Sequence, residues 1–299
     1  MATQWLTYRL YCQGLCSLLD KEKPIDKNTT MTQTKQYNTV LSIAGSDSGG
    51  GAGIQADIKA ISAMGCYAAT AITAVTVQNT LGVEAVHPIP LDILRGQIDC
   101  VLSDIGAKAV KIGMLHSAEV VEVVADALRR HNVTNIVLDP VMVSTSGHRL
   151  IEESAIATLR ERLLPMARVI TPNIPEAEIL AGVTITSNDQ LPEVARKLSG
   201  GGRTSVLLKA GHLTENRLVD HLYNAEDDTV TPLPSERIET RNTHGTGCTL
   251  SSALAAALAR GEGLTQAARS AKDYIDGAIR AGADYQIGRG HGPVNHFYK

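Results

Sequence analysis

From residue 38 onward, short apolar segments alternate with longer segments of helical periodicity, and this alternation limits the possible folds more than any other feature. Ile54, Ile58 and Ile61, for example, recur at the spacing of one helix face. The apolar segments lack a polar face, which is typical of strands in a mostly parallel sheet covered by helices. The sequence therefore predicts an α/β protein, with strands at 39–45, 69–78, 107–113, 135–140, 168–172 and 205–211 and helices over 54–61, 94–102, 120–128, 152–164, 188–199, 247–260 and 264–282.

The N-terminal residues follow no part of this pattern. Met31 offers a second plausible start, and acidic residues such as Asp20 argue against a transit peptide. No linker-like or low-complexity stretch interrupts residues 38–299. We therefore predict one domain over 38–299, preceded by a poorly ordered extension over 1–37 that is either loosely attached or the product of an upstream start site.

Composition narrows the possible partners and the compartment. With a formal net charge of −3, one Trp and one Phe, the chain lacks the basic surface and aromatic side chains that bind nucleic acids. No apolar run approaches the roughly 20 residues of a membrane span. The five cysteines are odd in number and mostly scattered, which argues against a disulfide framework and for a reducing cytoplasm. Cys12 and Cys16 form a lone pair, without the second pair of ligands that a metal site needs.

Polar residues and glycines collect where the predicted strands end. In an open parallel sheet, ligands bind at the carboxyl ends of the strands, where the loops into the helices begin. Polar residues and glycines at the strand ends, combined with apolar strand interiors, are typical of an enzyme. The residues concerned are the loop 45–53, Gln78 to Thr80, Met114, Asp139 to Val141, Asn173 with Glu176, and Lys209.

The first of these loops, residues 45–53, reads GSDSGGGAG and leads directly into a predicted helix. Glycines let the N–H groups of a helix N-terminus approach a bound anion closely. A P-loop is excluded, because Gly51 and Ala52 stand where that motif needs Lys and Ser or Thr. The dinucleotide pattern is met at Gly51, Gly53 and Ala56, but the acidic residue expected about 20 residues later is missing. Since a tight turn needs only one or two glycines, the loop is predicted to serve an anion.

A second glycine-rich loop, THGTGCTLSS at 243–252, also precedes a predicted helix. Gly245 and Gly247 free the backbone, so that the N–H groups near Thr246 can converge on an anion. Two such loops favour a pair of ligands, such as a nucleotide phosphate and a substrate hydroxyl.

Cys248 lies within this second loop, and two interpretations are open. A free cysteine is usually a small buried apolar residue. At a helix N-terminus, however, its thiolate is stabilised and it can act as a base or a nucleophile. This position makes Cys248 a catalytic candidate, whereas the nearby His244 is predicted to shape the loop.

The acidic residues near predicted helix starts also allow structural interpretations. Asp57 can be a favourable charge in the first turn of its helix. Asn173 and Glu176 can cap the helix that begins in TPNIPEAE. Asp139, which ends a strand just before Pro140, has less structural reason for its position.

The motifs along the chain are AGSDSGGGAGIQADIKA, ITAVTVQNTLGV, KIGML, VLDPVMVSTSG, TPNIPEAE, LLKAGH, NTHGTGCTLSSA and GHGPVNHF. Together, over about residues 38–297, they resemble the hydroxymethylpyrimidine/phosphomethylpyrimidine kinases of thiamine biosynthesis, which belong to the ribokinase-like superfamily. The resemblance implies a three-layer α/β/α fold and a homodimer. The implied reaction is the ATP- and Mg²⁺-dependent phosphorylation of 4-amino-5-hydroxymethyl-2-methylpyrimidine, followed by phosphorylation of the monophosphate to the diphosphate.

The resemblance also implies roles for particular residues. Those implied to contact the pyrimidine are Gly45, Ala52, Asp57, Gln78, Met114 and Val141. Those implied to form the anion hole and the catalytic group are Gly245, Thr246, Gly247 and Cys248. Those implied on the nucleotide and phosphate side are Asp139, Asn173, Glu176 and Lys209, with Glu176 assisting Mg²⁺ indirectly or through water. Thr145 stands where some members carry Lys, so no phosphate-binding cation is expected in that flap.

Two alternatives remain beside this interpretation. A pyridoxal/pyridoxine kinase shares the fold, the GTG-type loop and a hydroxymethyl acceptor on a six-membered ring, although VQNT and Cys248 favour the pyrimidine branch. A regulatory homologue without catalysis would be expected to lose Cys248 or the loop glycines, and this chain has kept both.

Overall fold

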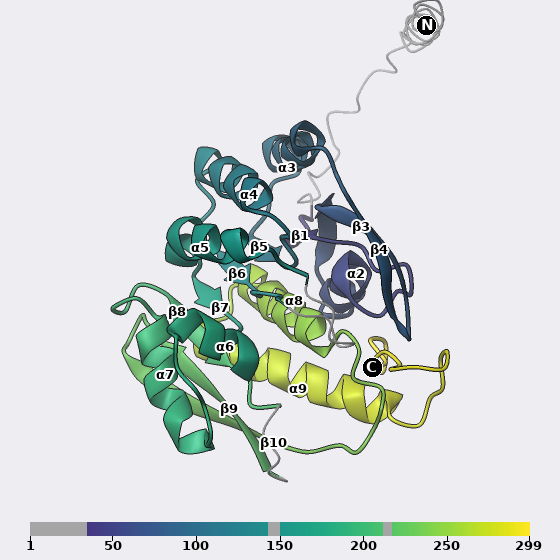
Figure 1. Cartoon of the computed structure of the whole chain (residues 1–299), viewed down its shortest axis with the longest axis vertical. Helices are drawn as coiled ribbons and strands as arrows, with labels where there is room; N and C mark the ends of the chain where they lie inside the picture. Colours follow the sequence, from purple (N-terminus) through teal and green to yellow (C-terminus); the bar gives the residue numbers. More distant parts are fainter. Residues whose placement is uncertain (1–34, 143–149, 212–216) are drawn as a thin grey trace, which may run out of the picture. The chain divides into compact units, whose positions relative to one another are not determined.

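The computed structural model describes residues 35–142, 150–211 and 217–299, and residues 37–299 form one compact unit. Within the described residues, its central sheet consists of β1 (Thr39–Ala44), β2 (Tyr67–Ile72), β5 (Ala109–Ile112), β6 (Ile136–Leu138), β7 (Val169–Ile170), β8 (Ser205–Leu208), β9 (Arg217–Asn224) and β10 (Thr229–Glu236). The strand order is β10-β9-β8-β7-β6-β5-β1-β2 (Figure 1). The strands from β8 to β2 pair in parallel, whereas β9 and β10 extend the sheet antiparallel. The predicted, mostly parallel sheet is confirmed.

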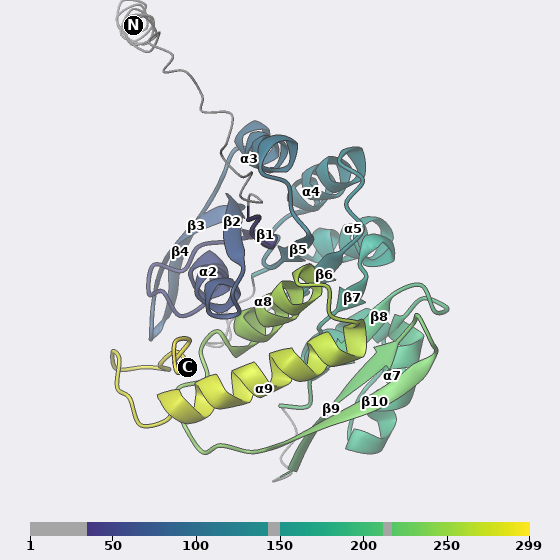
Figure 2. The same cartoon turned by 180° about the vertical axis from the view of Figure 1, so that it is seen from behind.

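Helices cover both faces of this sheet, as Figures 1 and 2 show from opposite sides. One layer contains α3 (Leu91–Asp104), α4 (Ala118–Arg130), α5 (Glu153–Arg162), α6 (Ile174–Ala181) and α7 (Leu191–Leu198), with the short 3₁₀ helices Leu164–Met166 and Asn188–Gln190. The other contains α2 (Gly53–Ala63), α8 (Thr246–Ala259) and α9 (Leu264–Gly282). Successive strand residues alternate between two apolar cores, since Leu41 packs with the first layer and Val40 with the second. The three-layer α/β/α fold is therefore confirmed.

The segment predicted as one strand at 69–78 is two strands in two sheets. The chain leaves β2 at Thr73, whose N–H still donates to Ala44 O and whose hydroxyl donates to Met114 O. It then forms β3 (Ala74–Asn79), which pairs antiparallel with β4 (Gly82–Pro88) outside the central sheet. Periodicity could not reveal this break, because the residues on both sides of Thr73 favour strands equally.

Near the carboxyl ends of the strands, the face toward α8 changes from apolar to polar. Along β1, Val40 is followed on the same face by Ser42, and along β5, Ala109 is followed by Lys111. On the facing helix, Ser252 is completely buried. A polar layer thus lies between the sheet and the first half of α8, directly below the region where the predicted site residues meet.

Candidate active site

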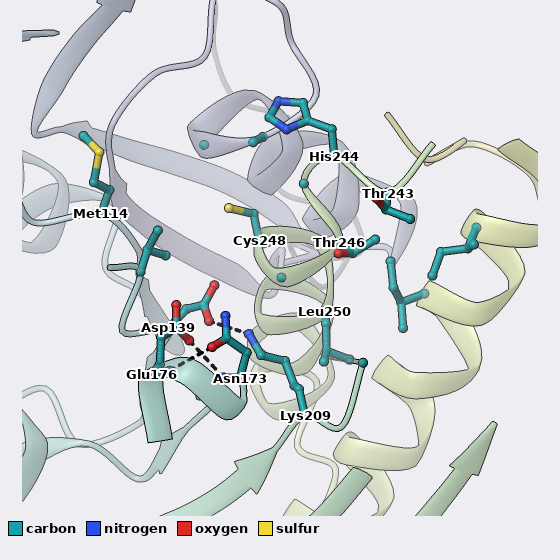
Figure 3. A pocket seen from close by; sticks show the side chains of 18 of the residues that line it. Met114, Asp139, Asn173, Glu176, Lys209, Thr243, His244, Thr246, Cys248 and Leu250 are labelled. Carbon is teal, nitrogen blue, oxygen red and sulfur yellow. Dashed lines mark hydrogen bonds and ion pairs between the residues drawn. The ribbon is translucent and has the colours of Figure 1, made fainter. Parts of the chain in front are cut away.

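A cavity of about 690 Å³ lies at the carboxyl ends of the parallel strands. All the predicted site residues except Asp57 line it, namely Gly45, Ala52, Gln78, Met114, Asp139, Val141, Asn173, Glu176, Lys209, Gly245, Thr246, Gly247 and Cys248. Figure 3 shows Asp139, Asn173, Glu176 and Lys209 gathered in one group, with Cys248 at the start of the neighbouring helix. The structure thus brings both glycine loops and the predicted phosphate-side residues to one cavity. Thr145 lies outside the described residues.

Asp57 is the exception, and its assignment to the substrate is corrected. Its carboxylate is completely buried below the cavity, where it pairs with Lys111 at 2.9 Å. The hydroxyls of Ser42 and Ser252 donate to the same carboxylate at 2.6 and 2.7 Å. Nor is Asp57 a first-turn charge, because α2 begins at Gly53 and has no acidic residue in its first turn.

Lys111 is the first residue of the KIGML motif, but the sequence indicated no role for it. The structure places it directly below the site, where it helps to hold the surrounding elements together. Its ammonium group is also fully buried. Burial alone would lower the pKa of Lys111, but the charge and hydrogen bond of Asp57, together with other nearby groups that include Asp139, raise the pKa above its ordinary value. The pair joins α2 and β5, and through Ser252 it also joins α8.

The first glycine loop folds around a carboxylate of its own. Asp47 is almost completely buried and accepts hydrogen bonds from three backbone N–H groups, those of Gly49 (2.8 Å), Gly51 (3.0 Å) and Ala52 (2.8 Å). Its Oδ2 atom also lies 2.8 Å from Nε2 of His244. Burial raises the pKa of Asp47, but these bonds lower it further, so that the pKa lies below its ordinary value. Asp47 therefore occupies the amide cradle that the sequence predicted for an external anion.

Two of the loop glycines are needed where backbone segments come very close to each other. A Cβ on Gly245, which has φ +80°, would lie 1.8 Å from Gly51 O. A Cβ on Gly53, with φ +54°, would lie 2.3 Å from Gly45 O. Only glycine combines this backbone conformation with such a close approach. Gly245 thus allows the contact between the two loops, and Gly53 allows the first loop to close on itself.

The second loop uses some of the amides that were predicted to bind an anion, since the N–H of Thr246 donates to Thr243 O at 3.3 Å. Gly245 is the N-cap of α8, and its carbonyl accepts from the N–H of Thr249. The N–H groups of Gly247 and Cys248 donate to no acceptor in the described part of the chain. Because they stand at a helix N-terminus and line the cavity, they are oriented to bind an anion.

The structure corrects the expectation that Cys248 carries a stabilised thiolate. Burial raises the pKa of the Cys248 thiol to about 11, with further raising contributions from the charges of Asp57 and Asp139. The Lys111 cation and the N–H of Gly53 oppose this shift without cancelling it.

Asp139 and Lys209 form the charged floor of the cavity next to this helix. Lys209 Nζ lies 3.0 Å from Asp139 Oδ1, and the Thr171 hydroxyl donates to the same oxygen at 2.9 Å. A Cβ on Gly247 would lie 3.3 Å from Lys209 Nζ. Although burial raises it, the cations of Lys209 and Lys111 lower the pKa of Asp139 overall. The ammonium group of Lys209 thus lies beside Gly247 at the start of α8.

Asn173 and Glu176 perform the capping role that the sequence allowed. The Asn173 side chain accepts from the N–H of Glu176, and the Glu176 carboxylate accepts from the N–H of Asn173, each at 2.9 Å. Burial, together with the nearby Asp139 charge, raises the pKa of Glu176 to about 7, although Lys209 opposes the shift. An additional cation bound nearby would therefore stabilise the ionised form of the Glu176 carboxylate.

Some lining residues carried no signal in the sequence. Asp220, Lys272 and Asp276 line the far end of the cavity, with Lys272 Nζ 2.9 Å from Asp220 and 3.3 Å from Asp276. They come from β9 and α9, and a lone charge on a strand or helix does not indicate its partners. Asp47 could have been suspected, since Asp before glycines often accepts from the following N–H groups.

The comparisons with known proteins bear directly on this arrangement. The family model described as phosphomethylpyrimidine kinase matches residues 47–295, which include both loops and the charged floor. This chain belongs to the phosphomethylpyrimidine kinase family. It is 49% identical over 260 residues to the hydroxymethylpyrimidine/phosphomethylpyrimidine kinase of Rhizobium meliloti, an alignment that covers 87% of this chain and 97% of that protein.

Two solved structures share the fold of this chain. Phosphomethylpyrimidine kinase from Clostridium difficile superposes with a TM-score of 0.72 at 42% identity, covering 81% of this chain and 99% of that one. Bacillus subtilis pyridoxal kinase, solved as an ADP complex, gives a TM-score of 0.80 at 37% identity and covers 87% and 98% of the two chains. The ribokinase-like expectation is thereby confirmed. In the described part of the chain, no helix is long and apolar enough to cross a membrane.

Proposed function

We propose that this enzyme transfers the γ-phosphoryl group of ATP to the hydroxymethyl oxygen of 4-amino-5-hydroxymethyl-2-methylpyrimidine. It then phosphorylates the resulting monophosphate to the diphosphate, in thiamine biosynthesis. The observation that carries this proposal is the pair of free amides, on Gly247 and Cys248, that open into the cavity beside Lys209. Family membership supplies the substrate class.

The acceptor is proposed to bind at the end of the cavity formed by the first loop. Gly45, Ala52, Gln78, Met114 and Val141 line this end. Gln78 Oε1 lies 3.2 Å from the Thr76 hydroxyl, which also donates to Ser46 O at 2.8 Å, and the amide lines the edge of the cavity. Such an amide can donate to one atom of an aminopyrimidine and accept from another.

The phosphates of ATP are proposed to bind between the start of α8 and the charged floor. The amides of Gly247 and Cys248 and the Lys209 ammonium group would stabilise the charge on the transferring phosphoryl group. Phosphoryl transfer depends mainly on positioning and on such stabilisation, so these groups supply most of what the reaction needs.

Mg²⁺ is proposed to accompany ATP at the same place. In the described residues, no group of three or more His, Cys, Asp or Glu could hold a metal ion. That fits Mg²⁺, which is usually bound by substrate phosphates, waters and one or two carboxylates. Glu176 is the carboxylate that an added cation would favour, since burial keeps its pKa near 7. When bound, the ion would neutralise phosphate charge.

Cys248 is proposed to lie next to the acceptor hydroxyl and to take its proton as the phosphoryl group moves. With a pKa of about 11, only about 10⁻⁴ of the thiol is ionised at pH 7. A base role therefore predicts that kcat rises with pH through the neutral range, and that Cys248→Ala loses on the order of 10²–10⁴ in kcat. A variant with nearly full kcat over the whole pH range would make Cys248 a packing residue.

One experiment tests the proposed function as a whole. The purified chain is incubated with ATP, Mg²⁺ and the hydroxymethylpyrimidine, and the mono- and diphosphate are followed over time. The monophosphate is expected to appear first and then decline as the diphosphate forms. If ADP release does not depend on the pyrimidine, the chain is not this kinase.

Pyridoxal is the second acceptor that a specific observation favours, because B. subtilis pyridoxal kinase superposes with a TM-score of 0.80. The two acceptors are compared by kcat/KM at equal concentrations. We expect the pyrimidine to be preferred, since the relative with 49% identity is a pyrimidine kinase. A higher kcat/KM for pyridoxal would reverse the assignment.

A homodimer is also proposed, from the outer face of the β3–β4 ribbon. Thr76 and Gln78 face the cavity, so the alternate residues Val75 and Val77 face away, and they are 44% and 54% exposed. Sedimentation of the wild-type chain is expected to give a dimer, and Val77→Lys a monomer. A wild-type monomer at micromolar concentration would contradict this proposal.

A further inference from the structure

The bond between Asp47 and His244 joins the two loops of the site. His244 Nε2 lies 2.8 Å from Asp47 Oδ2, and the two residues are 197 positions apart in the sequence. Both side chains are nearly buried, with 11% of His244 and 2% of Asp47 exposed. The bond directly joins a side chain of the first loop, residues 45–53, to a side chain of the second loop, residues 243–252.

Each partner is fixed within its own loop. Asp47 holds the N–H groups of Gly49, Gly51 and Ala52, so its carboxylate cannot move without the first loop. The backbone N–H of His244 donates to Gly292 O at 3.0 Å, which ties the second loop to the C-terminal segment. A shift of one loop is therefore passed to the other.

The imidazole also stands close to the part of the site that would recognise the acceptor. A Cβ on Gly51 would lie 2.5 Å from the His244 ring, and Gln78 Nε2 lies 3.5 Å from its Nε2 atom. Since Asp47 uses its Oδ2 atom to accept, Nε2 of His244 is the donor, and the ring is fixed in one tautomer and orientation.

We propose that Asp47 and His244 are positioning residues. Their bond keeps the first loop, and the acceptor bound there, correctly placed relative to the free amides of α8 during phosphoryl transfer. This inference rests on the proposed kinase activity. Neither residue is proposed to touch the reacting atoms. Misplacement by about 1 Å can reduce a rate by about 10²-fold, so loss of the bond should act on kcat.

The test compares His244→Leu, which removes the donor, with His244→Gln, whose amide nitrogen can take the place of Nε2. His244→Leu is expected to lower kcat by about 10²-fold while KM for ATP stays within about 2-fold. Because the acceptor is misaligned while ATP still binds, water should take the phosphoryl group in some turnovers, so ADP and inorganic phosphate should form in excess over the phosphorylated pyrimidine. His244→Gln should restore most of kcat and of the coupling between ADP and product.

A double-mutant cycle and a control variant far from the site complete the experiment. Asp47→Asn combined with His244→Leu should lose no more kcat than Asp47→Asn alone, because the single Asp47 variant already disturbs the bond to His244 together with the three bonds to the first loop. The matched control is Asp99→Asn, which breaks a half-exposed Asp–His bond of 2.9 Å to His131 on the other helix layer. It should leave kcat and the ratio of ADP to product unchanged.

The outcomes separate the alternatives. If His244→Leu melts at lower temperature but keeps its kcat and its ratio of ADP to product, the bond is only structural and the proposal is wrong. If His244→Gln is as slow as His244→Leu although it folds, the imidazole contacts the substrate itself, which also overturns the positioning role. If the wild-type chain shows no pyrimidine-dependent turnover in the same assay, the proposed function fails instead.

Discussion

Replacing Lys111 by Met tests whether the buried ion pair below the cavity stabilises the fold as its geometry indicates. The substitution keeps a long apolar side chain but leaves the Asp57 carboxylate, completely buried, with only the hydroxyls of Ser42 and Ser252 as partners. Removing one member of a buried pair typically costs about 3–5 kcal/mol of unfolding free energy, because the other charge stays buried without compensation.

That loss is large compared with the roughly 5–15 kcal/mol that stabilises a typical domain. For a domain of this size, it corresponds to a fall in Tm of about 6–20 °C. In the wild-type chain, the raised pKa of Lys111 means that the pair contributes fully below about pH 10 and is lost only as pH rises above that.

Urea denaturation at neutral pH measures the loss of unfolding free energy. The double variant Lys111→Met/Asp57→Asn should recover most of the lost free energy, since it leaves no buried charge. Lys108→Met is the matched control, because Lys108 lies on the same segment but is exposed, and it should change stability by less than about 0.5 kcal/mol. If Lys111→Met costs less than about 1 kcal/mol, or if the double variant is no more stable than the single one, the pair does not stabilise the fold as argued.

Three further predictions concern the ligands and the N-terminal extension. Gln78→Leu should raise KM for the pyrimidine by an amount equivalent to about 1–3 kcal/mol, because a buried base edge loses its partner, while KM for ATP is unchanged; equal rises in both constants would exclude a direct contact. Because the pKa of Glu176 is near 7, the Mg²⁺ concentration that gives half-maximal rate should fall as pH rises toward 7 and then level off. Glu176→Gln should abolish that dependence, and a variant that retains it would show that another group responds. Removal of residues 1–30 should leave kcat and Tm unchanged, whereas a large fall in Tm would show that the extension packs on the domain.

The sequence by itself determined the features that depend on neighbouring residues. The alternation of apolar and helical segments predicted the parallel sheet and its covering helices. Asn173 and Glu176 predicted a capping box, which the structure contains. The glycines before α2 and α8 marked the two loops of the cavity, because local backbone conformation and helix N-termini leave their mark on short stretches of sequence.

Only the tertiary structure decided which partner each of these residues meets. Ser252 reaches Asp57 across 195 positions, which places that carboxylate below the cavity rather than beside the substrate. Asp47 fills the amide cradle of the first loop, and burial raises the pKa of the Cys248 thiol where a lowered pKa was expected. Charge, burial and pKa depend on groups brought together by packing, and a residue's neighbours in sequence do not specify its neighbours in space.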